Sequence, residues 1–149
     1  MRVVLALDKF KGSASASELN AAARDALAAV GSIDVMCVPL ADGGDGTTEV
    51  LASTISGQWI TLSTMPPLLS LLPVEARYFL CDNGTAIIEV AAASGLALVP
   101  EDRRDVMQAT TVGTGLLMRD AVERGSSDVV LGLGGSATCD GAIDRKSVV

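Results

Sequence analysis

Seven consecutive residues, Ala41-Asp42-Gly43-Gly44-Asp45-Gly46-Thr47, combine three glycines and two carboxylates between a strand-like run and a helix-like run. The glycines permit positive φ angles and close approach of a ligand, and successive amides at a helix start can surround an anion. The carboxylates offer a general base or ligands for a hard cation such as Mg²⁺. The alternative is a tight turn whose Asp45 or Thr47 caps the next helix.

Two other loops carry similar chemistry. Asp8 to Ser13 contains Lys11, and Gly134 to Gly141 contains Asp140; each loop follows a strand-like run. If the three strands are parallel in one sheet, all three loops lie at its carboxyl edge, where α/β sheets bind ligands. Lysine, carboxylates and glycine-rich backbone are the groups that phosphoryl transfer requires. No GxxxxGK[ST] motif occurs, so a Walker-type NTPase is excluded.

We therefore predict a reaction centre formed by Asp42, Asp140 and Lys11. The two carboxylates would act as base or as Mg²⁺ ligands, and Lys11 would pair with a phosphate or carboxylate. The loop residues predicted to bind substrate or phosphate are Asp8, Ser13, Gly43, Gly44, Asp45, Gly46, Gly134, Gly135, Ser136 and Thr138. A competing pattern, Gly132-Leu133-Gly134 with Ala137, fits the dinucleotide fingerprint but has no acidic residue at the required distance after it.

Composition limits the possible functions. The 149 residues suffice for one domain with its own core, and 49% apolar against 3% aromatic residues is typical of an α/β protein. The net charge of −7 argues against nucleic acid or an anionic membrane as partner. Histidine is absent, which excludes Ser-His-Asp and Cys-His catalysis and histidine-ligated metals.

The cysteines and the apolar runs predict a cytoplasmic protein. Cys37, Cys81 and Cys139 have no CxxC spacing, so we expect buried, reduced thiols. The first apolar run is too short for a signal peptide, and residues 86–100 are too polar and too short to span a bilayer.

Periodicity predicts a βαβ unit at the start of the chain. Residues 2–7 and 33–40 read as strands, and a helix between them begins with a capping box at Ser15 and Glu18 and ends at Gly31. A second helix is expected over residues 47–56, ended by Gly57, and a short strand over 59–63.

The second half is predicted to contain an antiparallel hairpin. Strands 74–81 and 85–90 flank the turn Asp82-Asn83-Gly84, and residues 64–73 receive no assignment. A helix follows Thr110-Thr111 and ends at Gly125, before a strand over 128–133. The fold class is α/β: a Rossmann-like parallel sheet with helices on both faces, plus part of a second lobe containing the hairpin. The corresponding division is 1–63 and 108–143 for the main α/β domain, 64–107 for the hairpin-containing insert or second-lobe segment, and 144–149 for a tail.

Five motifs in order resemble the bacterial glycerate kinase family. They are the three loops above, Glu89-Val90-Ala91-Ala92-Ala93-Ser94-Gly95-Leu96, and Thr110-Thr111-Val112-Gly113-Thr114-Gly115. The resemblance implies a two-lobed kinase that phosphorylates D-glycerate with ATP and Mg²⁺. It adds Glu89 and Ser94 as substrate-binding candidates, although an ion pair with Arg77 is an alternative role for Glu89.

The sequence departs from the family at several places. Lys9 replaces a small polar residue, Asp45 a Glu and Cys139 an Asn, and a leucine-rich connector replaces the usual turn before Pro73. Family members are more than twice as long, and residues 144–149 do not continue their pattern. We expect a truncated reading of a longer gene, inactive by itself and prone to self-association through an uncovered sheet edge. The alternatives are a short paralogue with a divergent tail and a non-catalytic anion- or nucleotide-binding module.

Overall fold

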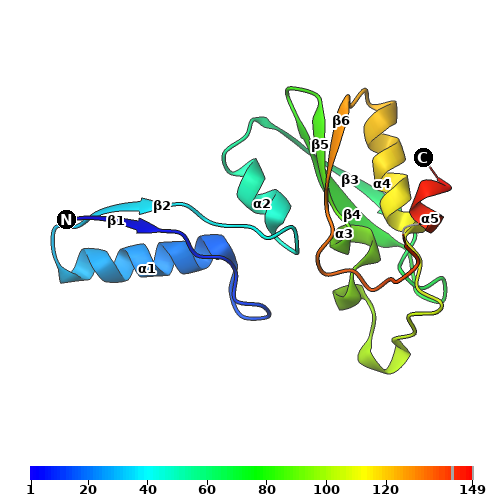
Figure 1. Cartoon of the computed structure of the whole chain (residues 1–149), viewed down its shortest axis with the longest axis horizontal. Helices are drawn as coiled ribbons and strands as arrows, with labels where there is room; N and C mark the ends of the chain where they lie inside the picture. The colour runs from blue at the N-terminus through cyan, green and yellow to red at the C-terminus, as the bar shows by residue number, and fades with distance from the viewer. Residues whose placement is uncertain (142, 149) are drawn as a thin grey trace.

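The computed structural model describes residues 1–141 and 143–148 and contains two β-sheets (Figure 1). One sheet has two strands and the other has four. The two-stranded sheet and its helix lie at one end of the long axis of the molecule (Figure 1). Within the described residues, no helix is long and apolar enough to cross a membrane.

The two-stranded sheet is the predicted βαβ unit. Strands β1 (Arg2–Leu5) and β2 (Asp34–Cys37) pair in parallel, and α1 (Ala16–Val30) connects them. The capping box is confirmed: the Ser15 hydroxyl accepts from the Glu18 amide at 3.2 Å, and the Glu18 carboxylate accepts from the Ser15 amide at 2.8 Å.

A buried amide fixes the end of this unit. Asn20 on α1 is 1% exposed, and its Nδ2 donates to the carbonyls of Leu7 at 3.1 Å and Ala16 at 2.7 Å. The Leu7 carbonyl also accepts from the Leu40 amide at 3.0 Å, so α1 and the segment after β2 both hold the chain where it leaves β1. Asn20 therefore helps to fix the start of the Asp8–Ser13 loop.

The four-stranded sheet has the order β3-β4-β5-β6. Antiparallel strands β3 (Gly57–Thr64), β4 (Val74–Cys81) and β5 (Thr85–Glu89) confirm the predicted hairpin, and β5 pairs in parallel with β6 (Asp128–Gly132). Helix α4 (Val112–Glu123) lies between β5 and β6 in sequence and packs on the sheet.

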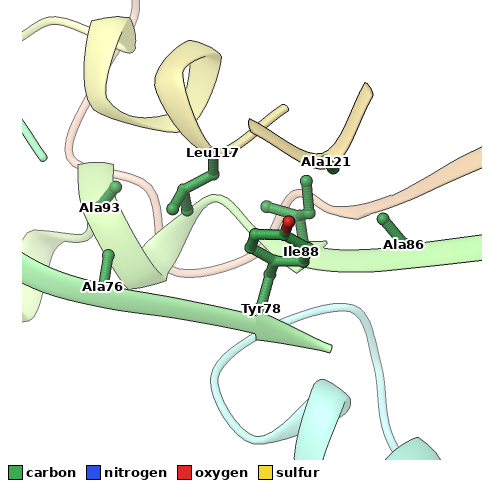
Figure 2. Packing of buried hydrophobic residues seen from close by; sticks show 7 residues of the cluster. All are labelled: Ala76, Tyr78, Ala86, Ile88, Ala93, Leu117 and Ala121. Carbon is green, nitrogen blue, oxygen red and sulfur yellow. The ribbon is translucent and has the colours of Figure 1, made fainter. Parts of the chain in front are cut away.

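The main core lies between one face of this sheet and α4 (Figure 2). Small side chains alternate with large ones, so that helix and sheet approach closely. The buried residues are Ala76, Tyr78, Ala86, Ile88, Ala93, Leu117 and Ala121. The Tyr78 hydroxyl donates to Asp120 at 2.8 Å, which satisfies the one polar atom of the ring.

Helix α2 (Thr47–Ala52) covers the opposite face, where Leu51 and Ala52 pack against Phe79 and Ile87. Helices therefore lie on both faces of the sheet, and the predicted α/β class is confirmed. The helix is shorter than predicted. The hydroxyls of the two residues after it donate back to backbone carbonyls and end the helix, and Gly57 begins β3 instead of capping it.

Two other expectations need correction. The strands before the three glycine- and aspartate-bearing loops do not share one sheet, because β1 and β2 form one sheet and β6 belongs to the other. Of the three cysteines expected to be buried, Cys81 is buried, Cys37 is half-buried and Cys139 is exposed. The hairpin of β4 and β5 pairs with β3 on one side and with β6 on the other, so that strands from all three predicted segments share one sheet. The division of the chain at residues 63 and 108 stays a prediction.

Shorter elements complete the chain. They are α3 (Ala91–Ser94) with two 3-10 turns, Leu96–Leu98 and Glu101–Arg103, and a final helix α5 (Ile143–Lys146). Residues 65–73 contain no helix or strand, but Leu68 is buried against Val99 and Ala109. Helix α5 packs on α4, and the Arg145 amide donates to the Thr111 hydroxyl at 2.9 Å.

Candidate active site

A salt bridge joins the first two loops. The Lys9 Nζ atom lies 3.1 Å from Oδ1 of Asp42, and the same oxygen accepts from the Gly44 amide at 2.9 Å. The Gly44 amide, and after it Lys9, lower the pKa of the Asp42 carboxyl below its usual range. Asp42 is therefore a carboxylate at neutral pH.

The second and third loops touch through their backbones. The Gly134 amide donates to the Gly43 carbonyl at 2.8 Å. A Cβ atom on Gly134 would lie 2.5 Å from the Gly44 Cα, and one on Gly135 would lie 2.9 Å from Oδ1 of Asp45. The three loops thus meet as predicted, although their strands belong to two sheets. At this contact glycine is required for packing between loops.

The first two loops enclose a pocket of about 620 Å³. It contains five of the predicted site residues: Asp8, Lys11, Ser13, Asp45 and Gly46. Lys9, Thr47 and the first turn of α1 also line it. Two lysines on one wall, close to carboxylates on the other, suit a small ligand that carries negative charge and hydroxyl groups.

The amides of the glycine loop already have partners within the protein. Gly43 donates to the Thr47 hydroxyl at 3.0 Å, and Thr47 donates to the Gly44 carbonyl at 3.1 Å. The amides of Gly46 and Thr48 both donate to the carboxylate of Glu89. The predicted anion-binding amides therefore bind the protein's own carboxylates, Asp42 and Glu89. Neither Asp45 nor Thr47 caps α2, because the residue before the helix is Gly46, with a φ of 88°.

The alternative role for Glu89, an ion pair with Arg77, is not the one observed. Arg77 instead pairs with Glu49 of α2 at 2.6 Å and stacks 4.1 Å above the Trp59 ring. This contact ties α2 to β4 from the solvent side. The Glu89 carboxylate instead accepts hydrogen bonds from the backbone of the glycine loop.

The third loop packs on the end of β5 and the start of α4. The Asp140 carboxylate accepts from the Thr111 hydroxyl at 2.6 Å and from its amide at 3.2 Å. Ser136 and Thr138 share a hydroxyl hydrogen bond of 2.9 Å. Ser94 is fully buried and bonded to the Thr114 hydroxyl at 2.8 Å. These contacts give the four residues structural partners, and their binding of substrate stays a prediction.

The geometry limits how a metal could be held. No group of three His, Cys, Asp or Glu side chains with metal-binding geometry exists among the described residues. Mg²⁺ in phosphoryl-transfer sites needs only one or two carboxylates, the remaining ligands being phosphates and water. The charged and exposed Asp42 fits that requirement. The pairing of Asp42 with Asp140 at one metal ion stays a prediction.

Sequence reasoning did not assign a site role to Lys9 or to the two threonines, Thr47 and Thr111, that bind the loops. For Lys9 the signal was present: a second lysine two positions from Lys11 in an acidic chain. The contact of Thr111 with Asp140 spans 29 positions and has no local signal, whereas Thr47 binds Gly43 within its own loop.

The dinucleotide fingerprint lacks its structural context. That motif requires a helix that opens at its glycines, directly after the strand. Gly134 to Gly141, all of which the structure describes, form turns and irregular backbone with no helix. This favours the kinase interpretation of the same loop.

Comparison with known proteins identifies the family. The model of the glycerate kinase family matches residues 3–144. The chain is 41% identical to the glycerate kinase of Bacillus cereus; the match covers 100% of this chain and 39% of the relative. It is 40% identical to the glycerate 2-kinase of Escherichia coli K12, where the match covers 95% of this chain and 37% of the relative.

A solved structure agrees. The fold matches the crystal structure of a Salmonella typhimurium LT2 protein named as a glycerate kinase 2, with a TM-score of 0.79 and 37% identity over 99% of this chain and 40% of that one. The chain thus spans roughly two fifths of the length of these relatives. On the strength of the family match over nearly its whole length, this chain belongs to the glycerate kinase family.

Proposed function

We propose that the protein of which this chain forms at least a part is an ATP-dependent glycerate kinase, which acts in the cytoplasm and converts D-glycerate to phosphoglycerate. The observation that carries the proposal is the pocket between the first two loops, because the family match covers the segments that build it. Glycerate is a small hydroxy acid. A pocket with Lys9, Lys11 and nearby carboxylates offers cations for its carboxylate and acceptors for its hydroxyls.

The residues take different parts in this proposal. Lys11 pairs with the carboxylate of glycerate or with the transferred phosphate. Asp42 has a lowered pKa, and a general base works best with a pKa near the working pH. Asp42 is therefore better suited to orient Lys9 or to bind Mg²⁺ than to remove a proton. Bound Mg²⁺ with ATP would supply neutralisation of phosphate charge, and Asp140 is the second carboxylate proposed to hold it.

A hybrid enzyme tests the proposal. Residues 3–141 replace the matched segment of the Bacillus cereus glycerate kinase, so that the remaining three fifths come from that relative. Glycerate-dependent ADP formation is then measured with Mg²⁺ and ATP. We expect saturable turnover, and we expect Asp42→Asn to lower kcat by about a hundredfold or more without loss of the fold.

A matched control is Asp25→Asn on α1, which removes an exposed carboxylate outside the pocket and pairs only with a neighbouring arginine among the contacts described. It should leave turnover unchanged. A folded hybrid that binds ATP or glycerate without turnover would refute the kinase proposal and favour the non-catalytic binding module.

A further inference from the structure

Glu89 reaches from the end of β5 to the glycine loop, which lies between the two sheets. Its Oε1 accepts from the Thr48 amide at 2.6 Å and its Oε2 from the Gly46 amide at 3.3 Å. We propose that Glu89 is a positioning residue, which holds the loop from Asp42 to Thr48 in the shape that presents Asp45 to the pocket and Asp42 to Lys9.

Two other contacts hold the start of the loop: the salt bridge between Lys9 and Asp42, at 3.1 Å, and the hydrogen bond from the Gly134 amide to the Gly43 carbonyl, at 2.8 Å. Neither contact involves Gly46 or Thr48, where the loop meets α2. The hydrogen bonds from Gly43 to Thr47 and from Gly44 to Asp42 stay within the loop and do not fix it to a sheet. Gly46, the residue before α2, has no side chain with which to cap the helix. The Glu89 carboxylate supplies that cap from a residue 41 positions away in sequence from Thr48, and so ties the loop to the four-stranded sheet.

The Glu89 side chain lies beside Gly132 at the end of the neighbouring strand, β6. A Cβ atom on Gly132, the last residue of β6, would lie 3.6 Å from the Glu89 Cγ. The Gly132 carbonyl accepts from the Val90 amide at 2.9 Å. The hydrogen bonds from Gly46 and Thr48 fix the direction in which the carboxylate points, toward the start of α2.

The charge on this carboxylate is unfavourable for the fold. Burial is the largest influence on the pKa of Glu89 and raises it, and the negative charge of Glu49 raises it further. The hydrogen bonds from the amide and hydroxyl of Thr48 and from the Gly46 amide lower this pKa, but they do not cancel the effect of burial. Glu75 and Arg77 of β4 face the same hollow, and Arg77 is paired with Glu49. Since the folded protein holds the proton more tightly, stability falls as pH rises through the raised pKa and is flat above it. Burial of the ionised carboxylate reduces stability, and the same carboxylate binds the amides of Gly46 and Thr48, which is consistent with a role in positioning the loop.

Amide hydrogen exchange in the 149-residue chain tests the inference independently of kinase activity. Glu89→Gln keeps one acceptor oxygen but turns an NH2 group toward the other amide. We expect exchange at Gly46 or Thr48 to accelerate about tenfold or more, while the urea midpoint falls no further than in the control. The matched control is Glu75→Gln, which removes the same charge from the same hollow but breaks no hydrogen bond found in the structure.

The pH dependence of exchange separates positioning by charge from simple packing. The Gly46 and Thr48 amides favour the ionised carboxylate, although burial favours its protonated form. In the unsubstituted chain, protection of both amides against local opening should therefore fall as pH is lowered through the Glu89 pKa, after correction for the intrinsic rate. Glu89→Gln should abolish that dependence. Exchange at both amides within about twofold of the control, or an unchanged pH profile, would overturn the inference.

The link to catalysis rests on the proposed function and is measured in the hybrid enzyme. Glu89→Gln should lower kcat about tenfold or more, with a smaller change in the KM for ATP, while Glu75→Gln keeps normal turnover. Loosened amides with unchanged kcat would refute a role in catalysis. An inactive unsubstituted hybrid would refute the proposed function, and the exchange experiment would still decide the role of Glu89.

Discussion

The contact between Gly134 and the second loop makes a quantitative prediction. In Gly134→Ala the new Cβ would lie 2.5 Å from the Gly44 Cα, 2.9 Å from its amide nitrogen and 3.2 Å from the Gly43 carbonyl carbon. All three are backbone atoms, so no side chain can rotate away. The loops must separate, and the hydrogen bond from the Gly134 amide to the Gly43 carbonyl, 2.8 Å long, must lengthen or break.

The expected loss follows from these two effects. Forcing one extra methyl group into a packed contact costs about 1–3 kcal/mol. Losing the hydrogen bond adds about 1 kcal/mol. We therefore expect Gly134→Ala to lower the free energy of unfolding by about 2–4 kcal/mol, a large part of the stability of a chain of this size.

Urea unfolding followed by circular dichroism measures this loss. Gly31→Ala is the control, because no atom lies within 4 Å of the site of its new methyl group and its extended backbone suits alanine. The control should change stability by less than about 0.5 kcal/mol. If Gly134→Ala unfolds at the same urea concentration as the control, the two loops do not pack as described and the meeting of the three loops is wrong.

Three further predictions concern the first two loops. Asn20→Ala removes an amide that donates to two carbonyls, at 2.7 and 3.1 Å, and should lower the free energy of unfolding by about 2 kcal/mol, measured in urea. Lys9→Met should raise the pKa of Asp42 in an NMR titration, but not to its usual value, because the Gly44 amide also lowers it. Ser15→Ala should cost about 1 kcal/mol by loss of the helix cap, and replacement by Asp instead of Ala should restore most of it.

Much of the secondary structure was predictable because local signals determined it. The capping box placed the start of α1, the Asp82-Asn83-Gly84 turn placed the hairpin, and alternation gave β4 its correct bounds, Val74–Cys81. The end of α2 was not predictable, because two hydroxyls after it compete for its last carbonyls.

The arrangement of the site was predictable only in part. Three loops of similar composition were expected to meet and do meet, through the salt bridge between Lys9 and Asp42 and the hydrogen bond between Gly134 and Gly43. The distribution of the strands over two sheets was not expected, because apolar runs do not specify which strand each will pair with. The position of Glu89 depends on contacts across 41 and 43 positions in sequence, which no local pattern encodes.

The parallel pairing of β5 with β6 has a consequence for how the chain is synthesised. Strand β5 is translated long before its neighbour, because α4 and the turns around it intervene. At ordinary translation speeds those roughly 40 residues take about 2–8 s to emerge. During that interval the open edge of β5 presents Ala86, Ile87 and Ile88, which are fully or almost fully covered in the finished fold. Slow passage of the ribosome through α4 should therefore favour aggregation of nascent chains, and a chaperone that binds short apolar strands should act at this stage of synthesis.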